Sequence, residues 1–167
     1  AGADLGCAYV DAARLADPTL RHPTWTHGAL VERTLSGITR AELVRHGVAV
    51  FGRRPQDVLP EVSAEKVRAA AREELTGYWA MAVRRPWWWL DTTLAELGLA
   101  AMARGRHALE TGELITKTQA IDEAHAPEWL RVDMRARRGG SPVRLPRLRT
   151  AWIAWRDARR TTASAGR

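Results

Sequence analysis

Lysine, cysteine and long apolar runs are scarce in this sequence, and each shortage excludes a class of protein. Only Lys66 and Lys117 are lysines, so the formal charge of +7 comes almost entirely from arginine. Cys7 is the single cysteine, which rules out an internal disulfide framework and a cysteine-rich zinc site. No stretch approaches the ~20 apolar residues of a membrane span, and the first residues lack the order of a secretion signal. We therefore expect a cytoplasmic protein without membrane contact.

The composition that remains is that of a folded, basic protein. The chain has 167 residues, of which 46% are apolar, and this is enough to bury one core. A sequence pI near 10.8 favours acidic ligands such as phosphates or nucleic acid. A genome rich in GC would also produce many arginines and alanines and few lysines, so the charge alone does not identify a ligand.

The pattern along the chain predicts a mainly α fold, a helical bundle of four to five helices preceded by a small αβ segment. In the first 60 residues we expect a strand at 5–10, a hairpin within 22–35, a helix at 40–46 and a brief strand at 48–51. The bundle should occupy residues 61–160, and residues 161–167 should form a flexible tail. The helices of the bundle are predicted at 63–85, 87–111, 117–126, 128–138 and 147–160.

One stretch of the bundle combines apolar periodicity with basic residues. Leu90, Leu94, Leu97 and Ala101 recur on one helical face, and Arg104 falls on the same stripe. After a break at Gly112, residues 116–119 read Thr-Lys-Thr-Gln, which is the form of a capping box. Lys117 is then the first residue of a helix, where backbone N–H groups already favour an anion. In the last helix, Leu148, Trp152 and Trp155 form the predicted core stripe, and the other face is arginine.

Several motifs occur in an order that resembles the C-terminal part of the streptomycin/spectinomycin (aminoglycoside) adenylyltransferases and their actinobacterial relatives. The family pattern is Leu-x-x-x-Arg, then Thr-Gly, then Ser-Lys-x-x-Ala. This chain has Arg104, Thr111-Gly112 and Thr116-Lys117-x-x-Ala120 after the Leu94/Leu97 helix. The upstream residues fit the same order: Tyr9-Val10, His22-Pro23, His27-Gly28, Thr39-Arg40-x-x-Leu43-x-x-His46-Gly47-Val48-x-x-x-Gly52 and Leu59-Pro60-x-Val62-Ser63. The resemblance covers about residues 5–138, and residues 1–60 would be a remnant or the end of a nucleotidyltransferase domain.

The resemblance implies an activity and a set of binding residues. Family enzymes transfer AMP from ATP to a hydroxyl group of an aminoglycoside antibiotic, with the triphosphate held by a Gly-Ser turn and Mg2+ held by an Asp-x-Asp motif. By resemblance, Lys117 contacts ATP phosphate and Arg104 supports the same phosphates or braces the turn of Lys117. Candidate substrate contacts lie on the preceding segment: Trp87, Trp88, Trp89, Asp91 and Glu96. A run of tryptophans such as Trp87, Trp88 and Trp89 more often belongs to a core or an interface than to a drug site.

The catalytic motifs of that family are missing from this chain. No Asp-x-Asp occurs, and Gly140-Ser141 has no carboxylate pair downstream. The position of the family's proposed base corresponds to Gly6, and Asp4 is the nearest acid. We therefore expect no catalytic residues and no metal ligands here, and a chain that supplies the helical half of an ATP cleft and is inactive alone. It would be either a fragment of an adenylyltransferase or a complete protein that has lost the catalytic half.

Two alternatives remain open at the level of the sequence. The chain could be a non-catalytic helical module that binds a nucleotide, pairs with a separate catalytic chain or forms a homodimer. It could also bind nucleic acid through its basic C-terminal third. No recognition-helix motif or stacking platform is evident there, so we expect nucleic acid less than a nucleotide or an aminoglycoside-like molecule.

Overall fold

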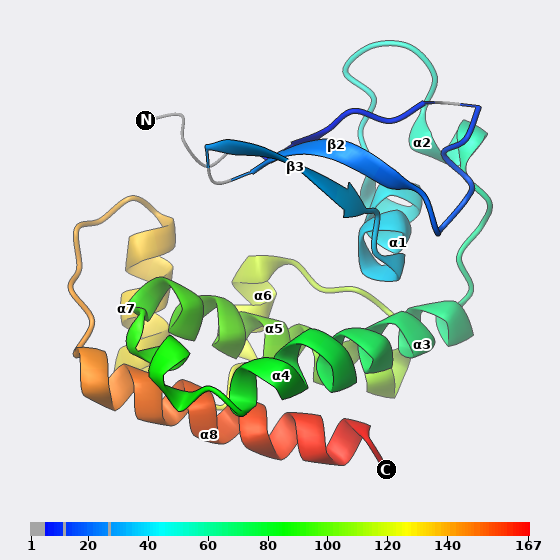
Figure 1. Ribbon diagram of the computed structural model, residues 1–167. Helices are drawn as coiled ribbons and strands as arrows, with labels where there is room; N and C mark the ends of the chain where they lie inside the picture. Colours follow the sequence, from blue (N-terminus) through cyan, green and yellow to red (C-terminus); the bar gives the residue numbers. More distant parts are fainter. Residues whose placement is uncertain (1–5, 12, 27) are drawn as a thin grey trace. The chain divides into compact units, whose positions relative to one another are not determined.

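The computed structural model describes residues 6–11, 13–26 and 28–167, which form two compact units, Ala1–Lys66 and Val67–Arg167. The protein is mainly helical and has a small antiparallel sheet near its N-terminus (Figure 1), as the sequence predicted. The division between the units falls after Lys66, beyond the predicted boundary at residue 60. Asp4 and His27 lie outside the described residues.

Unit 1 contains the sheet, in which strands β1 (Cys7–Ala8), β2 (Arg21–Thr26) and β3 (Ala29–Thr34) are adjacent in chain order. β2 and β3 form the predicted hairpin, with Arg21 opposite Thr34 and Thr26 opposite Ala29. Gly28 in its turn has a φ of 75°, a conformation that favours glycine. The hairpin prediction is confirmed, whereas the predicted first strand is reduced to two residues.

Two helices follow the sheet in unit 1, α1 (Gly37–His46) and α2 (Pro55–Val58). α1 begins earlier than predicted because Ser36, not Thr39, is its N-cap and accepts a hydrogen bond from the Thr39 N–H at 3.1 Å. Residues 48–51 were predicted as a strand, but they have no strand pairing and Phe51 is almost fully exposed. A strand also needs a neighbouring strand for its N–H and C=O groups, and the local composition that favoured a strand here could not show that such a neighbour is absent.

The boundary between the units lies within α3 (Ala64–Glu74), which continues in unit 2 as a π-helical turn η1 (Leu75–Trp79) and α4 (Ala80–Val83). Ser63 accepts a hydrogen bond from the Lys66 N–H at 3.3 Å, as expected of an N-cap. The wider π turn brings Trp79 into the core and leaves Tyr78 exposed. The helical spacing of the sequence predicts an apolar face of Val67, Ala71, Leu75, Tyr78 and Ala82, and all of these except Tyr78 are buried.

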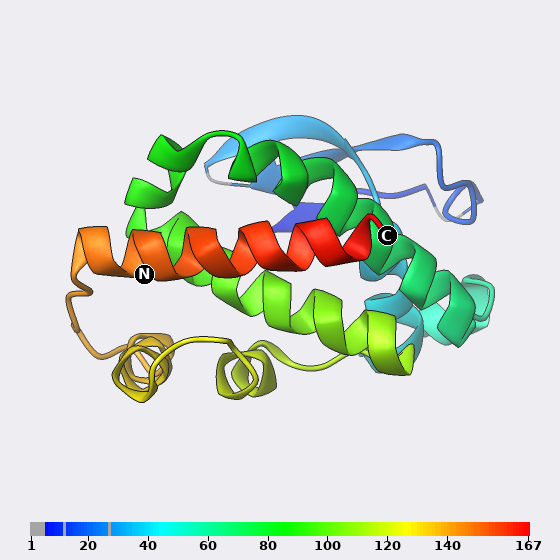
Figure 2. The same cartoon turned by 90° about the horizontal axis from the view of Figure 1, so that it is seen from below.

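The remaining elements of unit 2 are the 3-10 helix η2 (Pro86–Leu90), α5 (Thr92–Thr111), α6 (Lys117–Asp122), α7 (Glu128–Arg138) and α8 (Arg147–Ala165). α8 packs against α5 and α4, and Figure 2 shows it crossing the front of this unit. Among the described residues, no helix is long and apolar enough to cross a membrane. The largest fully buried side chains include those of Leu75, Trp89, Leu99, Met102 and Leu130.

The core face of α5 differs from the predicted stripe. Leu97 is 49% exposed, whereas Leu99 and Met102 are fully buried. The buried face also holds Gly98, where an added Cβ would come within 2.4 Å of Trp89 Cζ3. Because Trp89 fills this space, the helix presents small residues toward it. Leu94 and Ala101 of the predicted stripe are partly buried against the core, so the stripe borders the buried face and does not lie at its centre.

The core face of α8 is also different from the prediction. Leu148 and Trp152 are 74% and 59% exposed, and Trp155 is only partly buried. The buried side chains are small: Thr150, Ala151, Ala154, Asp157, Ala158, Thr161, Thr162 and Ala165. Small side chains allow α8 to approach its neighbours closely, so Trp152 faces outward, whereas Trp155 is partly buried against the core. The tail expected at residues 161–167 is helical as far as Ala165, because Thr161, Thr162 and Ala165 pack inward.

Candidate functional site

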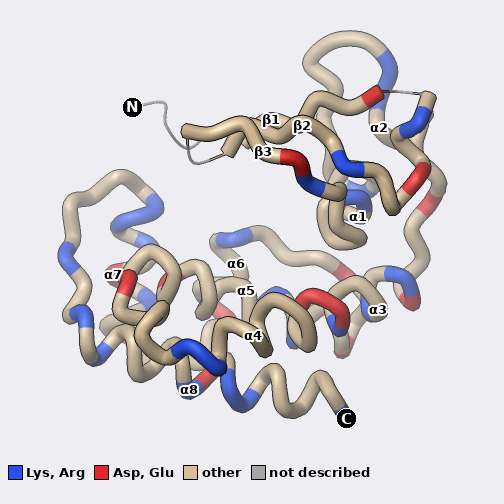
Figure 3. Tube along the Cα trace, viewed as in Figure 1, with Lys and Arg blue, Asp and Glu red and all other residues tan. Residues whose placement is uncertain are grey.

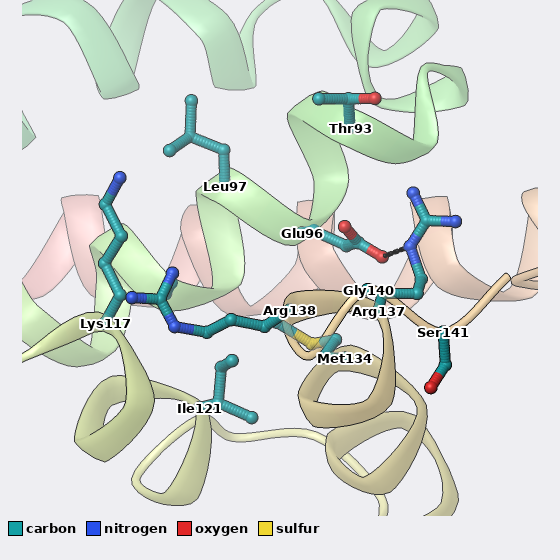
Figure 4. Close-up of a pocket in the computed structure, with 11 residues that line it drawn as sticks. Thr93, Glu96, Leu97, Lys117, Ile121, Met134, Arg137, Arg138, Gly140 and Ser141 are labelled. Atoms are coloured by element: carbon teal, nitrogen blue, oxygen red, sulfur yellow. Dashed lines mark ion pairs between the residues drawn. The ribbon is translucent and has the colours of Figure 1, made fainter. Parts of the chain in front are cut away.

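A pocket of about 480 Å³ opens in unit 2 among α5, α6 and the C-terminal end of α7 (Figure 4). Its volume lies within the range of about 300–1,000 Å³ that is typical of small-ligand sites. Two of the residues predicted from the sequence, Lys117 and Glu96, line it. The full lining is Thr93, Glu96, Leu97, Ala100, Lys117, Ile121, Met134, Arg137, Arg138, Gly140 and Ser141.

Local sequence signals place Lys117 at this pocket. Gly112 ends α5 with a φ of 76°, and the predicted capping box then starts α6. Thr116 Oγ1 accepts a hydrogen bond from the Gln119 N–H at 3.2 Å, and Gln119 Oε1 accepts one from the Thr116 N–H at 2.9 Å. These reciprocal bonds fix the backbone on both sides of Lys117, so both the capping box and the helix start are confirmed.

Arg104 supports the loop that leads to Lys117. Its Nε donates a hydrogen bond to the Ile115 carbonyl oxygen at 3.1 Å, and the side chain is half-buried. Arg104 is not among the lining residues of the pocket. Of the two roles that the resemblance offered for Arg104, this contact matches the bracing of the Lys117 turn.

The α6 end of the pocket carries two cations. Arg138 donates from Nε to Thr118 Oγ1 at 3.2 Å, and Figure 4 shows its side chain extending toward Lys117. Within the described part of the chain, no carboxylate forms an ion pair with either Lys117 or Arg138. Two positive charges that share a pocket repel each other, and an anion placed between them removes this repulsion.

An ion pair occupies the other end of the pocket. Glu96 Oε1 lies 2.5 Å from Arg137 Nε, although the N–H does not point along the line of a good hydrogen bond. Burial raises the pKa of Glu96 above its ordinary value of 4.5, and the charge of Arg137 partly opposes this. Arg137 also donates to the Val143 carbonyl oxygen at 2.8 Å. This pair therefore neutralises itself and holds the loop after α7.

The other residues proposed as substrate contacts lie outside the pocket. Trp87 is 61% exposed, and the Arg85 guanidinium lies 5.0 Å from the ring centroid of half-buried Trp88. Trp89 is fully buried and donates from Nε1 to the Ala82 carbonyl oxygen at 3.1 Å. Its assignment as a substrate contact is therefore wrong, because a core side chain cannot reach a ligand. Asp91 is the N-cap of α5 and accepts a hydrogen bond from the Thr93 N–H at 2.8 Å.

Sequence analysis missed the contribution of α7. Arg137 and Arg138 were counted only as part of a basic C-terminal third, yet both line the pocket. The run Arg135-Ala136-Arg137-Arg138 before the Gly139-Gly140 break is the signal that was present. It showed a basic helix end without showing that this end meets α6.

The residues of this pocket do not fit a magnesium site. Glu96 is the one carboxylate among the lining residues, and it is already paired with Arg137. Mg2+ is usually bound through carboxylates together with substrate phosphates. Among the described residues, no group of three or more His, Cys, Asp or Glu side chains could hold a metal ion.

Comparison of the chain with protein-family models, curated proteins and solved structures finds no match. The similarity to aminoglycoside adenylyltransferases therefore stays a prediction from the motifs. The pocket has to be interpreted from its own residues.

Proposed function

We propose that this protein binds the phosphates of a nucleotide, ATP by the resemblance, in the pocket of unit 2, as the non-catalytic helical wall of a nucleotidyltransferase-like cleft. The observation that carries the proposal is the convergence of Lys117 and Arg138 without a carboxylate partner among the described residues. A phosphate group would accept hydrogen bonds from both side chains and neutralise both charges.

The chemistry of the two cations suits a polyphosphate. A lysine ammonium is a mobile point charge, and an arginine guanidinium offers a planar pair of donors that matches two phosphate oxygens. Between the cationic end and the ion pair, Leu97, Ile121 and Met134 line the pocket. This apolar stretch would receive the less polar part of the same ligand, such as a nucleobase.

The aminoglycoside part of the resemblance receives less support from the site. Its lining contains Lys117, Arg137 and Arg138 against the single acid Glu96. A pocket with excess positive charge repels the ammonium groups of an aminoglycoside. We therefore place the nucleotide in this pocket and propose no acceptor here.

Isothermal titration with ATP, with and without Mg2+, tests the proposal. Lys117→Ala and Arg138→Ala should each weaken binding at least about tenfold, which corresponds to about 1.4 kcal/mol. Lys66→Ala is the matched control, because Lys66 is the other lysine of the chain, is exposed and lies outside the pocket. Equal affinity of the wild type and Lys117→Ala for ATP would sink the proposal.

A transfer assay tests the non-catalytic part of the proposal. This chain alone should transfer no labelled AMP from ATP to streptomycin, because the Asp-x-Asp motif whose carboxylates would hold the metal ions of nucleotidyl transfer is missing from the sequence. Any transfer that depends on Lys117 would show that other residues supply this chemistry.

A further inference from the structure

The outward face of α8 has the residues of a second binding site, separate from the pocket at Lys117. Trp152, Trp155, Arg156, Arg159, Arg160 and Ala163 surround a hollow of about 400 Å³, and we call these six residues the α8 face. Figure 2 shows α8 along the front of unit 2. None of the six residues lines the pocket at Lys117.

The two tryptophans of the α8 face form a pre-arranged aromatic platform. Their ring centroids are 5.5 Å apart, and the rings are inclined by 33°. Trp155 is held in place because its Nε1 donates to the Val83 carbonyl oxygen at 3.0 Å. Trp152 lies beside this fixed ring and is 59% exposed, so its ring is open to a ligand.

The core of unit 2 does not require Trp152, whereas Trp155 is partly buried against that core. α8 packs inward through Ala151, Ala154 and Ala158, which are nearly or fully buried. Exposing a large indole to water forgoes the free energy of burying it, and large exposed apolar groups bordered by polar residues are typical of interaction sites. The exposed Trp152 therefore points to a partner.

The positive charge of the α8 face favours a negatively charged partner. Five arginines lie on α8, and its one acid, Asp157, is buried and paired with Arg106 at 2.8 Å. The acid therefore does not neutralise the outer side of the helix. The arginines are Arg147, Arg149, Arg156, Arg159 and Arg160, and the Lys and Arg positions of the chain are blue in Figure 3.

We propose that the α8 face binds single-stranded nucleic acid, with a base stacked on Trp152 and the backbone phosphates contacted by Arg156 and Arg160. Stacking on aromatic rings beside arginines is the recognition mode of proteins that bind single strands without sequence preference. In a duplex the base faces are hidden, so the platform would add nothing to binding there.

Other occupants match the face less well. A second copy of this chain would bring two arginine-rich α8 faces together, and their like charges would oppose such a dimer. An acidic protein segment would use the arginines but would leave the tryptophan pair without a role. A single strand uses both the charge and the rings.

Fluorescence anisotropy with a labelled oligothymidylate of about 20 nucleotides tests the proposal. Trp152→Ala should weaken binding at least about fivefold, because it removes a stacking surface. Trp87→Ala is the matched control, since Trp87 is similarly exposed but lies on η2. Circular dichroism of both variants checks that the helices remain folded.

A salt series tests the role of the arginines. The double variant Arg156→Ala/Arg160→Ala should lower the slope of log affinity against log salt by about 1.4, because each neutralised phosphate of a single strand contributes about 0.7. An unchanged slope would contradict phosphate contacts at these two residues.

The proposal is overturned if the wild type does not bind the oligothymidylate, or if the wild type and Trp152→Ala bind it with equal affinity. It is also overturned if polyglutamate displaces the labelled strand as well as unlabelled oligothymidylate does. The site is independent of the pocket proposed for ATP. Trp152→Ala should leave ATP binding unchanged, and Lys117→Ala should leave oligonucleotide binding unchanged. If Lys117→Ala weakens oligonucleotide binding as much as Trp152→Ala does, the α8 face is not a separate site.

Discussion

Unit 1 and unit 2 are held together by different kinds of interaction. In unit 1, every residue of β3 is exposed, and the buried side chains include that of Arg40, which donates hydrogen bonds to backbone carbonyl oxygens. Unit 2 buries a large apolar cluster that includes Trp89, Leu99 and Met102. Unit 1 thus relies on directed polar contacts, whereas unit 2 relies on apolar burial.

Arg40 shows how unit 1 does without a large core. Its guanidinium donates to the carbonyl oxygens of Leu15, Asp17 and Leu35 at 2.5, 2.7 and 3.2 Å. One side chain therefore links α1 to two preceding loop segments. Loss of a single polar residue should therefore loosen unit 1, whereas unit 2 should respond to loss of apolar volume.

The largest expected effect follows from truncating the core of unit 2. Leu99→Ala should destabilise unit 2 by about 2–5 kcal/mol, because a fully buried leucine leaves a cavity. Leu97→Ala on the same helix is the control, and it should cost far less because Leu97 is half exposed. Urea unfolding followed by circular dichroism measures both. Equal losses of unfolding free energy in Leu99→Ala and Leu97→Ala would mean that Leu97 is as much a part of the core as Leu99.

A smaller effect is expected from Arg40→Met in unit 1. Three carbonyl oxygens lose their donor, and we expect a loss of about 1–3 kcal/mol because water can reach part of this site. Hydrogen exchange should accelerate within residues 13–46 and stay unchanged in α5 and α8. Arg33→Met, on the exposed strand β3, is the control. Faster hydrogen exchange in both units would contradict the inference that the contacts of Arg40 stabilise unit 1 alone.

The smallest expected effect is the change of unfolding free energy with pH, which should have opposite signs for Glu96 in unit 2 and Asp17 in unit 1. In unit 2, burial raises the pKa of Glu96, so its contribution to stability is present below 4.5 and is lost as the pH rises through the raised value. In unit 1, hydrogen bonds from the side chain and N–H of Thr19 lower the pKa of Asp17. That contribution is present above 3.8 and is lost as the pH falls.

The Glu96→Gln variant isolates the contribution of Glu96. The difference in unfolding free energy between the wild type and Glu96→Gln should fall as the pH rises from about 4 to about 7. Asp17→Asn serves as the control in unit 1, where the dependence on pH should run the other way. Parallel curves for the wild type and Glu96→Gln would contradict the raised pKa.

Local signals in the sequence predicted part of the candidate site correctly. The capping box at residues 116–119 and the break at Gly112 depend on neighbouring residues, so both were found in the structure as expected. The meeting of Lys117 with Arg138 depends on how α6 and α7 pack, and nothing local indicates it. The substrate assignment of Trp89 failed for the same reason, because periodicity does not distinguish a core ring from an exposed one.

Propensity, capping and composition act over a few residues, so the sequence alone was enough to predict the helical class, the hairpin, the break at Gly112, the start of α6 and the positive charge of α8. The buried faces of α5 and α8 depend on tertiary packing. Small residues at Gly98 and Ala154 allow close packing, and this turns Leu97 and Trp152 outward. Both proposed sites, the pocket at Lys117 and the α8 face, depend on this packing. Close helix packing is a property of the whole unit and not of any one segment.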